Sequence, residues 1–365
     1  MTRLGRWCAV AVAASLLVVA PLVGRWLPAG SADAGPEELL ATARAAVDRP
    51  WSGSAETEGT LQLPDADRFG TVTALFGERT DLRVWWRDRE HWRVDRLLLT
   101  GETDQVRDGD TTVEWSYERG EASYSREPDL RLPRPADLVP PVLTERLLRG
   151  VGPADVTVLP SRRLAGESAA GLRVRPPSPL SSIDHVDLWV GEDSDLPLLV
   201  EVYADGEARP SFTSRFSDVS TEPPGDDVLD FEPTPSTDVE RDDVLDIADA
   251  ANQYAPVRPP ATAAGLALGP ASDGAVGVYG EGTAQVIAIP LRDREAGALR
   301  EQMAITPGVE QDSERTVVTL GPLGVLLTGA DGDGGWLLAG TLTRDALEQA
   351  GRDVSTGFVF VEDRR

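Results

Sequence analysis

The stretch "LRVWWRDREHWRVDRLLLTGETDQVRDG", residues 82–109, alternates apolar and charged residues with the two-residue period of a β-strand. Leu82, Val84 and Trp86 fall on one face of an extended segment, and Trp92 and Val94 repeat the rhythm after the polar residues 88–90. The stretch therefore predicts a β-hairpin. Short polar turns at 108–110 and 119–120 predict an antiparallel meander whose strands are 51–63, 82–88, 91–99, 102–107, 111–118 and 121–126.

Two helices are expected beside this meander. Residues 36–48 form an amphipathic pattern that opens with Pro-Glu-Glu, and a Pro-rich interruption at 127–150 holds a second helix at 140–149, with prolines in its first turn. The apolar face of the second helix consists of Val139, Val142, Leu143, Leu147 and Leu148. Strands are then expected at 155–160, 162–175, 184–191, 197–204 and 210–219.

A boundary is predicted at "TEPPGDDVLDFEPTPSTDVERDD", because this stretch is too rich in proline and acid to pack. We therefore expect a first domain over 36–233, a linker over 222–241 and a smaller α+β domain over 242–365. In the second domain the pattern predicts helices at 242–254, 293–303 and 343–351, and strands at 274–280, 284–291, 315–320, 323–329, 335–341 and 357–362.

Charge and composition exclude several classes of function. The formal charge of −26 would repel polyphosphates, so nucleic acid is not an expected partner, although Arg and Trp together can stack on single strands. All 35 basic residues are arginine, and the missing lysine excludes P-loops, Schiff-base enzymes, Ser-x-x-Lys nucleophiles and kinases.

The first 34 residues predict export. Arg3 and Arg6 precede an apolar stretch at 7–23, and Ala32-Asp33-Ala34 supplies a small-x-small cleavage pattern. The stretch is also long enough to remain as an N-terminal membrane anchor, so both a secreted and an anchored extracytoplasmic protein remain open. Cys8 is the single cysteine, and a cleaved chain would have neither disulfides nor thiolate metal sites.

The sequence offers no convincing catalytic or metal centre. His91 and His185 fit ordinary sheet positions, and "GESAA" at 166–170 reads as a hairpin turn rather than a nucleophile elbow, because strands flank it on both sides. "ADGDGGW" at 330–336 lacks later ligands of a calcium loop, and the acid pairs 226–227 and 242–243 fit a solvated linker. We expect no catalytic residue, no cofactor and no metal.

The aromatic stripe allows two interpretations. A long meander with one helix midway has more apolar sheet face than that helix covers, so the sheet either closes on itself or leaves a concave apolar groove. The residues expected to line such a groove are Val84, Trp86, Trp92, Val94, Val113, Trp115, Tyr117, Val186, Leu188 and Val200.

The stretch "DLWVGEDSDLPLLVEVYADGEARPSFTSRFSDV", residues 187–219, resembles the LolA-type lipoprotein carriers and their relative RseB (also called MucB), a periplasmic regulator that senses lipoproteins and lipopolysaccharide. The shared elements are a Leu-Trp-Val strand, an acidic turn ending at Leu196-Pro197, the strand "LLVEVY", a turn with Asp205-Gly206 and a last strand that ends at Val219. The likeness covers about 36–233. Ser194-Asp195 stands where the family often has Thr-Gly. A weaker likeness toward RseB is carried by "VYGEGTAQVIAIP", a strand-turn-strand, and by "WLLAGTLTRDALEQAG", a late strand followed by a helix.

This resemblance implies an α+β, β-rich fold: an open antiparallel half-barrel with a lid helix at 140–149 and a smaller C-terminal α+β domain. It implies a non-enzymatic, extracytoplasmic protein that holds an acyl chain, lipid or lipoprotein in the groove. A sensor acting on a membrane partner, such as an anti-sigma factor or transporter component, is favoured by the second domain, and a simple carrier is the alternative. A carbohydrate-acting hydrolase, with tryptophans stacked on sugars and a carboxylate pair, is the rival from another class.

Overall fold

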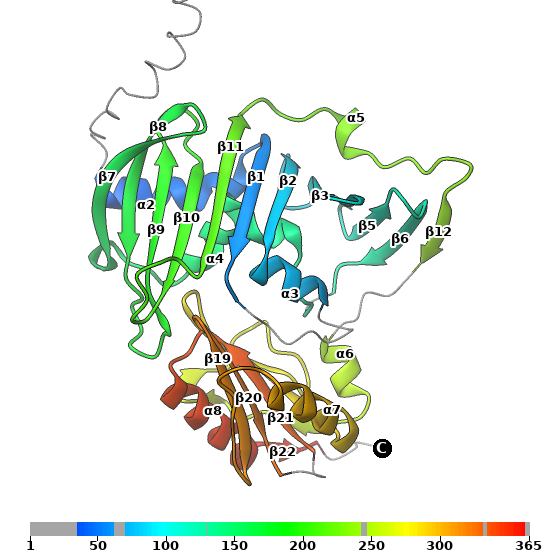
Figure 1. The fold of residues 1–365 in the computed structure, drawn as a ribbon, viewed down its shortest axis with the longest axis vertical. Helices are drawn as coiled ribbons and strands as arrows, with labels where there is room; N and C mark the ends of the chain where they lie inside the picture. Colours follow the sequence, from blue (N-terminus) through cyan, green and yellow to red (C-terminus); the bar gives the residue numbers. More distant parts are fainter. Residues whose placement is uncertain (1–34, 62–69, 129, 242–246, 331–333, 362–365) are drawn as a thin grey trace, which may run out of the picture.

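The protein is built around one large, unclosed sheet with a smaller domain beneath it (Figure 1). The computed structural model describes residues 35–61, 70–128, 130–241, 247–330 and 334–361, with no side-chain description for 70–73. The expected export segment, Cys8 and part of 330–336 lie outside the described residues. Within the described ranges, no helix is long and apolar enough to cross a membrane.

The large sheet has 12 strands in the order β12-β6-β5-β4-β3-β2-β1-β11-β10-β9-β8-β7. Their bounds are β1 Trp51–Gly59, β2 Arg79–Trp86, β3 His91–Leu98, β4 Gly101–Asp108, β5 Thr111–Ser116, β6 Glu121–Arg126, β7 Val156–Leu164, β8 Glu167–Val174, β9 Ile183–Gly191, β10 Pro197–Ala204, β11 Phe212–Ser220 and β12 Asp238–Arg241. All neighbours are antiparallel except β12 and β6. The sheet ends at β7 and β12 without closing, which confirms the open architecture that the resemblance implies.

Helices cover one face of this sheet, which we call the inner face; the opposite face is the outer face. The covering elements are α2 (Pro36–Ala45), the 3₁₀ helices η1 (Ala46–Asp48) and η2 (Pro135–Leu138), and α4 (Pro140–Leu147). The last 3₁₀ helix before β7 is η3 (Pro153–Asp155). Proline at the first position fixes a helical φ at the start of α2 and of α4, which is why the sequence located both.

Helix α3 (Gly70–Gly77) was not expected from the sequence. Its residues "GTVTALFG" include β-branched side chains of modest helix propensity, so the local pattern gives no helical signal. Tertiary packing overrides this preference, because Leu75 is fully buried and the Phe76 ring lies 5.5 Å from that of Phe212 on β11.

Residues 221–241, which we call the strap, correct the expectation that this stretch cannot pack. The strap contains α5 (Asp226–Leu229) and ends in β12, which adds a parallel strand to β6 at the sheet edge (Figure 1). Phe231 packs on Trp115 and Tyr124, with ring centroids 5.4 and 6.3 Å away. Arg87 on the β2–β3 turn bonds the Pro224 carbonyl and the Asp226 carboxylate at 2.9 and 2.6 Å.

The second domain has a six-stranded antiparallel sheet in the order β16-β17-β21-β20-β19-β18. Its elements are α6 Ile247–Asn252, β13 Val257–Arg258, β14 Thr262–Ala263, β15 Leu266–Ala267, β16 Gly277–Glu281, β17 Ala284–Leu291, α7 Asp293–Ala304, β18 Glu310–Gln311, β19 Arg315–Leu320, β20 Leu323–Thr328, β21 Gly335–Gly340, α8 Arg344–Gly357 and β22 Val359–Phe360. The Thr343 hydroxyl caps α8 by accepting from the Ala346 amide, and Leu347, Ala350 and Val354 of this helix are buried against the sheet.

Backbone hydrogen bonds join the domains, among them one from the Ile247 amide of α6 to the Leu130 carbonyl at 3.0 Å. The β8–β9 loop extends downward, where Ser182 donates its amide to the Thr341 carbonyl at 3.1 Å and Leu180 accepts from Thr343 at 2.7 Å. The Ser181 hydroxyl also donates to the Thr283 carbonyl at 2.6 Å. The domains are therefore connected by direct hydrogen bonds as well as by the strap.

We expect Phe231→Ala to destabilise the first domain by about 2 kcal/mol, less than a fully buried phenylalanine would, because the ring is half-buried between Trp115 and Tyr124. Urea unfolding followed by tryptophan fluorescence measures the change. Leu99→Ala is the control, since the Leu99 side chain is fully exposed at the β3–β4 turn. Equal midpoints for the two variants would show that the strap contributes no stability.

Candidate functional site

A stack of three tryptophans lies on the inner face. The Trp86 ring is parallel to those of Trp51 and Trp92 within 3°, at centroid distances of 5.5 and 6.0 Å. Trp51 donates its indole N–H to the Ala46 carbonyl at 3.2 Å, and Trp86 donates to the Val47 carbonyl at 2.9 Å. The stack thus supplies apolar area and also satisfies two carbonyls of η1, which fixes that turn on the sheet.

The inner face of β9 and β10 is also apolar and is covered by α2. Val186, Leu188 and Val200 are each at most 1% exposed. They belong to one buried cluster with Leu39 and Leu40 of α2. Side chains of α2 therefore occupy space that an exposed groove would leave open.

Helix α4 bridges the two apolar regions. Val139 and Val142 pack in the cluster that contains the tryptophan stack, whereas Leu143 and Leu147 pack against the cluster of β9, β10 and α2. The helix contacts β10 and β11 and ends at Leu147, two residues before the end of the expected helix at 140–149.

Seven of the ten residues expected to line the groove lie on the inner face or in its clusters, and all seven are buried: Val84, Trp86, Trp92, Val94, Val186, Leu188 and Val200. The other three do not join them. Val94 is directly opposite Gln105, which is directly opposite Glu114, so these three side chains share the inner face. Val113 and Trp115 are the neighbours of Glu114 along β5, and they therefore point to the outer face, under the strap. Tyr117 follows β5 and is 71% exposed.

The error has a simple physical cause. Side chains alternate between sheet faces, so one residue of register decides the face of a whole strand. The apolar residues of β5 resemble those of β2 and β3, but the pairing of β4 with its neighbours gives them the opposite orientation.

A buried carboxylate anchors the start of α4. Asp137 of η2 is 4% exposed and accepts from both Arg131 nitrogens at 2.6 and 3.0 Å, from Arg146 at 2.6 Å and from the Arg134 amide at 2.8 Å. Burial opposes its ionisation, but the hydrogen bonds and charges of the two guanidinium groups hold the pKa of Asp137 below its usual range.

Two further polar contacts fix the segment. The Ser214 hydroxyl of β11 donates to the Leu138 carbonyl at 2.6 Å, and Arg44 of α2 donates to the Leu148 carbonyl at 2.8 Å and to that of Val151. Helix α4 is therefore attached by specific hydrogen bonds at its ends, with apolar contacts between them.

The two histidines make no nucleophile-base pair in the described part of the chain. His91 is hydrogen-bonded to Asp88 at 2.9 Å, and the His185 ring is stacked on Tyr203 at 4.3 Å. Burial, together with the Glu201 charge, raises the pKa of Tyr203 to about 12, which keeps this phenol protonated. Neither arrangement activates a hydroxyl or thiol.

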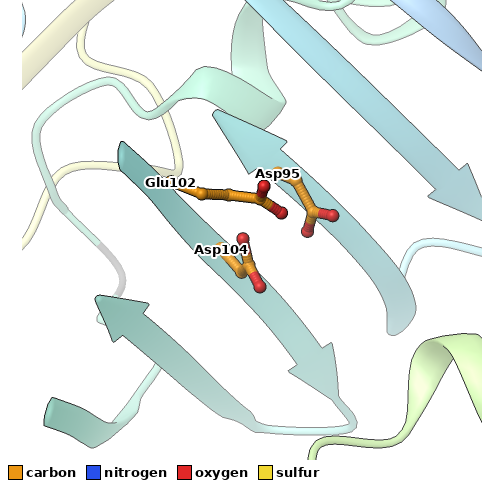
Figure 2. Close-up of side chains that lie close together, drawn as sticks. All are labelled: Asp95, Glu102 and Asp104. Atoms are coloured by element: carbon orange, nitrogen blue, oxygen red, sulfur yellow. The ribbon is translucent and has the colours of Figure 1, made fainter. Parts of the chain in front are cut away.

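Three carboxylates that the sequence did not single out come together on the outer face of β3 and β4: Asp95, Glu102 and Asp104 (Figure 2). In the sequence they are ordinary polar positions of alternating strands. Only the pairing of Asp95 with Asp104 brings them together, so no local signal could have identified them.

A surface hollow of about 610 Å³ lies in the second domain, between Tyr254, Trp336 and Phe358. The sequence did not indicate it. Arg292 lies over the Tyr254 ring at 4.5 Å, which places a cation at its wall.

We expect Asp137→Asn to lower the free energy of unfolding by about 3 kcal/mol, because the buried Arg131 would lose Asp137 and keep only Glu127 as its counter-charge. The depressed pKa of Asp137 also means that its contribution is present above the unfolded pKa of about 3.9 and is lost as the pH falls through the lower folded value. Urea unfolding at pH 7 and pH 3 tests both statements.

Asp205→Asn, at an exposed turn, is the matched control and should unfold as the wild type does. A wild-type midpoint and pH dependence in Asp137→Asn would show that the cluster does not anchor α4.

No protein-family model matches the chain, and no curated protein matches it. Among solved structures, MucB in the MucA/MucB complex of Pseudomonas aeruginosa is similar over 87% of this chain and 96% of that chain, with 16% identity and a TM-score of 0.51. A second structure, MucB bound to periplasmic MucA, has 16% identity, the same coverage and a TM-score of 0.48. A LolA superfamily protein of Nitrosomonas europaea covers 54% of this chain and 98% of its own, with 14% identity and a TM-score of 0.25.

At these identities the likeness is one of fold. The likeness spans both domains, and it is to the same kind of protein that residues 187–219 resemble. The chain therefore has a fold similar to that of MucB, and the likeness extends over both of its domains.

Proposed function

We propose that this chain is a non-enzymatic, extracytoplasmic protein that takes an acyl chain, lipid or lipidated protein between the inner face and helix α4. The proposal rests on one observation: the inner face is apolar from the tryptophan stack to β10, and α4 covers it while being fixed by polar contacts at its ends. Release of those contacts would uncover an apolar surface without breaking the sheet.

Binding would exchange the contacts of α4 with the sheet for contacts of the acyl chain with the sheet. Each buried CH₂ group gains roughly 0.8 kcal/mol, so a tail of about ten methylenes gains roughly 8 kcal/mol, within the range that association costs. The same tail would replace the contacts of Val142, Leu143 and Leu147 with the sheet. Because one apolar cover replaces another, opening and closing can be nearly balanced, as a binding protein requires.

The second domain supports a sensor more than a carrier. Gly282, in the β16–β17 turn, packs on the Arg149 carbonyl at the end of α4, since a Cβ at this glycine would lie 2.4 Å from that oxygen. Gly150 and Glu281 are also close, since a Cβ at Gly150 would lie 2.9 Å from the Oε1 atom of Glu281. Movement of α4 would therefore act directly on the second domain.

The protein expected to respond to a change in the second domain is a membrane partner. The MucB structures contain MucA, in one of them its periplasmic part, and the shared two-domain fold makes a protein of that kind, a membrane anti-sigma factor, the first partner to consider. A transporter component is the alternative if the protein is a carrier. The acidic surface, with a formal charge of −26, suits a partner with a basic face.

The hydrolase alternative needs an accessible pair of acids beside a tryptophan, and the pair beside Trp115 is buried. Asp95 and Asp104 converge near Trp115, but they are 2% and 4% exposed and both are bound by Arg93. A sugar could not reach them without displacing that guanidinium, so the geometry favours a binding protein.

We expect the purified full chain to bind a fluorescent fatty acid such as dansyl-undecanoic acid. Native mass spectrometry should also detect lipid that stays bound to the protein during purification. Arg146→Ala should speed fatty-acid entry by about three- to ten-fold, because it removes one anchor of α4 while Arg131 still holds Asp137. Stopped-flow fluorescence measures the rate.

Arg149→Ala is the matched control, since Arg149 belongs to the same helix end and pairs with the neighbouring Glu145. Its entry rate should equal that of the wild type. Absence of any retained lipid together with no saturable fatty-acid binding would refute the proposal.

We expect Gly282→Ala to weaken communication between the domains. A methyl group there would collide with the Arg149 carbonyl and would strain a backbone with φ of +59°. Hydrogen exchange measured with and without the fatty acid should show a ligand-dependent change around 281–284 in the wild type, reduced at least about three-fold in the variant.

Gly265→Ala controls for backbone strain, because Gly265 has φ of +78° and open space around it. Equal ligand-dependent exchange in all three proteins would favour the carrier over the sensor.

A further inference from the structure

We propose that Asp95, Glu102 and Asp104 form a binding site for a divalent cation, with calcium as the preferred ion. The three side chains project from the outer face of β3 and β4 toward one another (Figure 2). This site lies on the opposite side of the sheet from the inner face, so the inference does not depend on the proposed function.

The strands hold the ligands in place. Asp95 and Asp104 are directly opposite each other in the β3–β4 ladder, and Glu102 lies two residues from Asp104 on the same face. One oxygen from each carboxylate lies within 4.8 Å of the other two. An ion at the centre could therefore be reached by small changes of side-chain torsion alone.

The charges in the cluster are not balanced by the protein. Arg93 is the single cation that contacts the trio among the described residues, at 2.6 Å from Asp95 and 2.7 Å from Asp104. Three carboxylates thus share one guanidinium, with Asp95 and Asp104 only 2% and 4% exposed. Buried like charges of this kind need a counter-ion or a proton.

Unused bonding capacity points to a ligand. Asp104 gives one oxygen to Arg93, while its Oδ1 is buried without a hydrogen-bond donor in the described part of the chain. The Glu102 carboxylate beside it is half-exposed. A cation would supply the missing partner of Asp104 Oδ1. The half-exposed Glu102 carboxylate would let the cation enter from solvent.

The donor chemistry selects the ion. Carboxylate oxygens without nitrogen or sulfur suit a hard cation. Calcium accepts six to eight oxygens in irregular geometry, whereas magnesium demands near-octahedral order and releases its water reluctantly. Three carboxylates beside a fixed arginine give an irregular, one-sided site, which favours calcium with waters completing its shell.

A proton is the competing occupant. Burial and the nearby Asp95 charge raise the pKa of Asp104 to about 7, against the opposing effect of Arg93, so in the absence of an ion this carboxyl is partly protonated near neutral pH.

Terbium luminescence provides the test on the full chain. Trp115 is directly opposite Asp104 in the β4–β5 ladder, so excitation of tryptophan should sensitise a terbium ion in the site. We expect saturable luminescence, displaced by calcium with an apparent Kd of about 10⁻⁴–10⁻³ M, the range of extracellular calcium modules, and displaced at least about ten-fold less well by magnesium.

Asp104→Asn should weaken terbium and calcium binding at least ten-fold, and Glu102→Gln, at a half-exposed position that the fold does not need, should do so by about three-fold or more. Asp108→Asn is the control, because Asp108 lies on the same strand with its side chain 85% exposed. Its binding should match the wild type.

Two results would overturn the inference. One is the absence of saturable terbium or calcium binding at millimolar ion while Asp104→Asn raises the melting temperature, which would assign the cluster to a shared proton. The other is an equal loss of binding in Asp108→Asn, which would assign binding to the diffuse surface charge.

Discussion

The structure depends on one constraint: a long apolar sheet that does not close must have its inner face covered by the chain itself. Trp51, Trp86 and Trp92 present one continuous aromatic surface there, and water contact with it would be unfavourable. Helices α2 and α4 supply the cover, and the indole N–H groups of Trp51 and Trp86 lock the connecting turn η1 to the sheet. The cover is therefore part of the core of the domain, and it is also the part that a lipid ligand would have to replace.

The outer face is covered differently. The strap crosses β3 to β6, places Phe231 on Trp115 and closes the edge of β6 with β12. An exposed edge strand is a liability for aggregation, and a parallel strand of charged residues at this edge protects it. A segment whose composition suggests a free linker is thus held by a few apolar anchors among its prolines and acids.

Two buried acidic groups show how charge is managed in this domain. Asp137 receives hydrogen bonds from two arginines and a backbone amide, so its charge is balanced and fixes the start of α4. Asp104 shares one arginine with Asp95, and its Oδ1 has no hydrogen-bond donor among the residues that the structure describes. The first arrangement is complete within the protein, and the second is complete only with a proton or an ion.

Local periodicity, turn residues and short motifs were enough to predict the long strands of both domains and the helices that begin with proline. The open sheet followed only from the resemblance in residues 187–219 to the LolA/RseB-like proteins, because periodicity alone allows a closed sheet as well. The sequence also identified seven buried residues of the inner face. Tertiary structure alone decided the rest. It turned Val113 and Trp115 to the outer face through the register of β4, made a helix of 70–77 through the burial of Leu75, folded the strap against the sheet and joined Asp95 to Asp104. Each of these depends on which strand lies beside which, and contacts between residues far apart in the chain leave no mark on the local pattern.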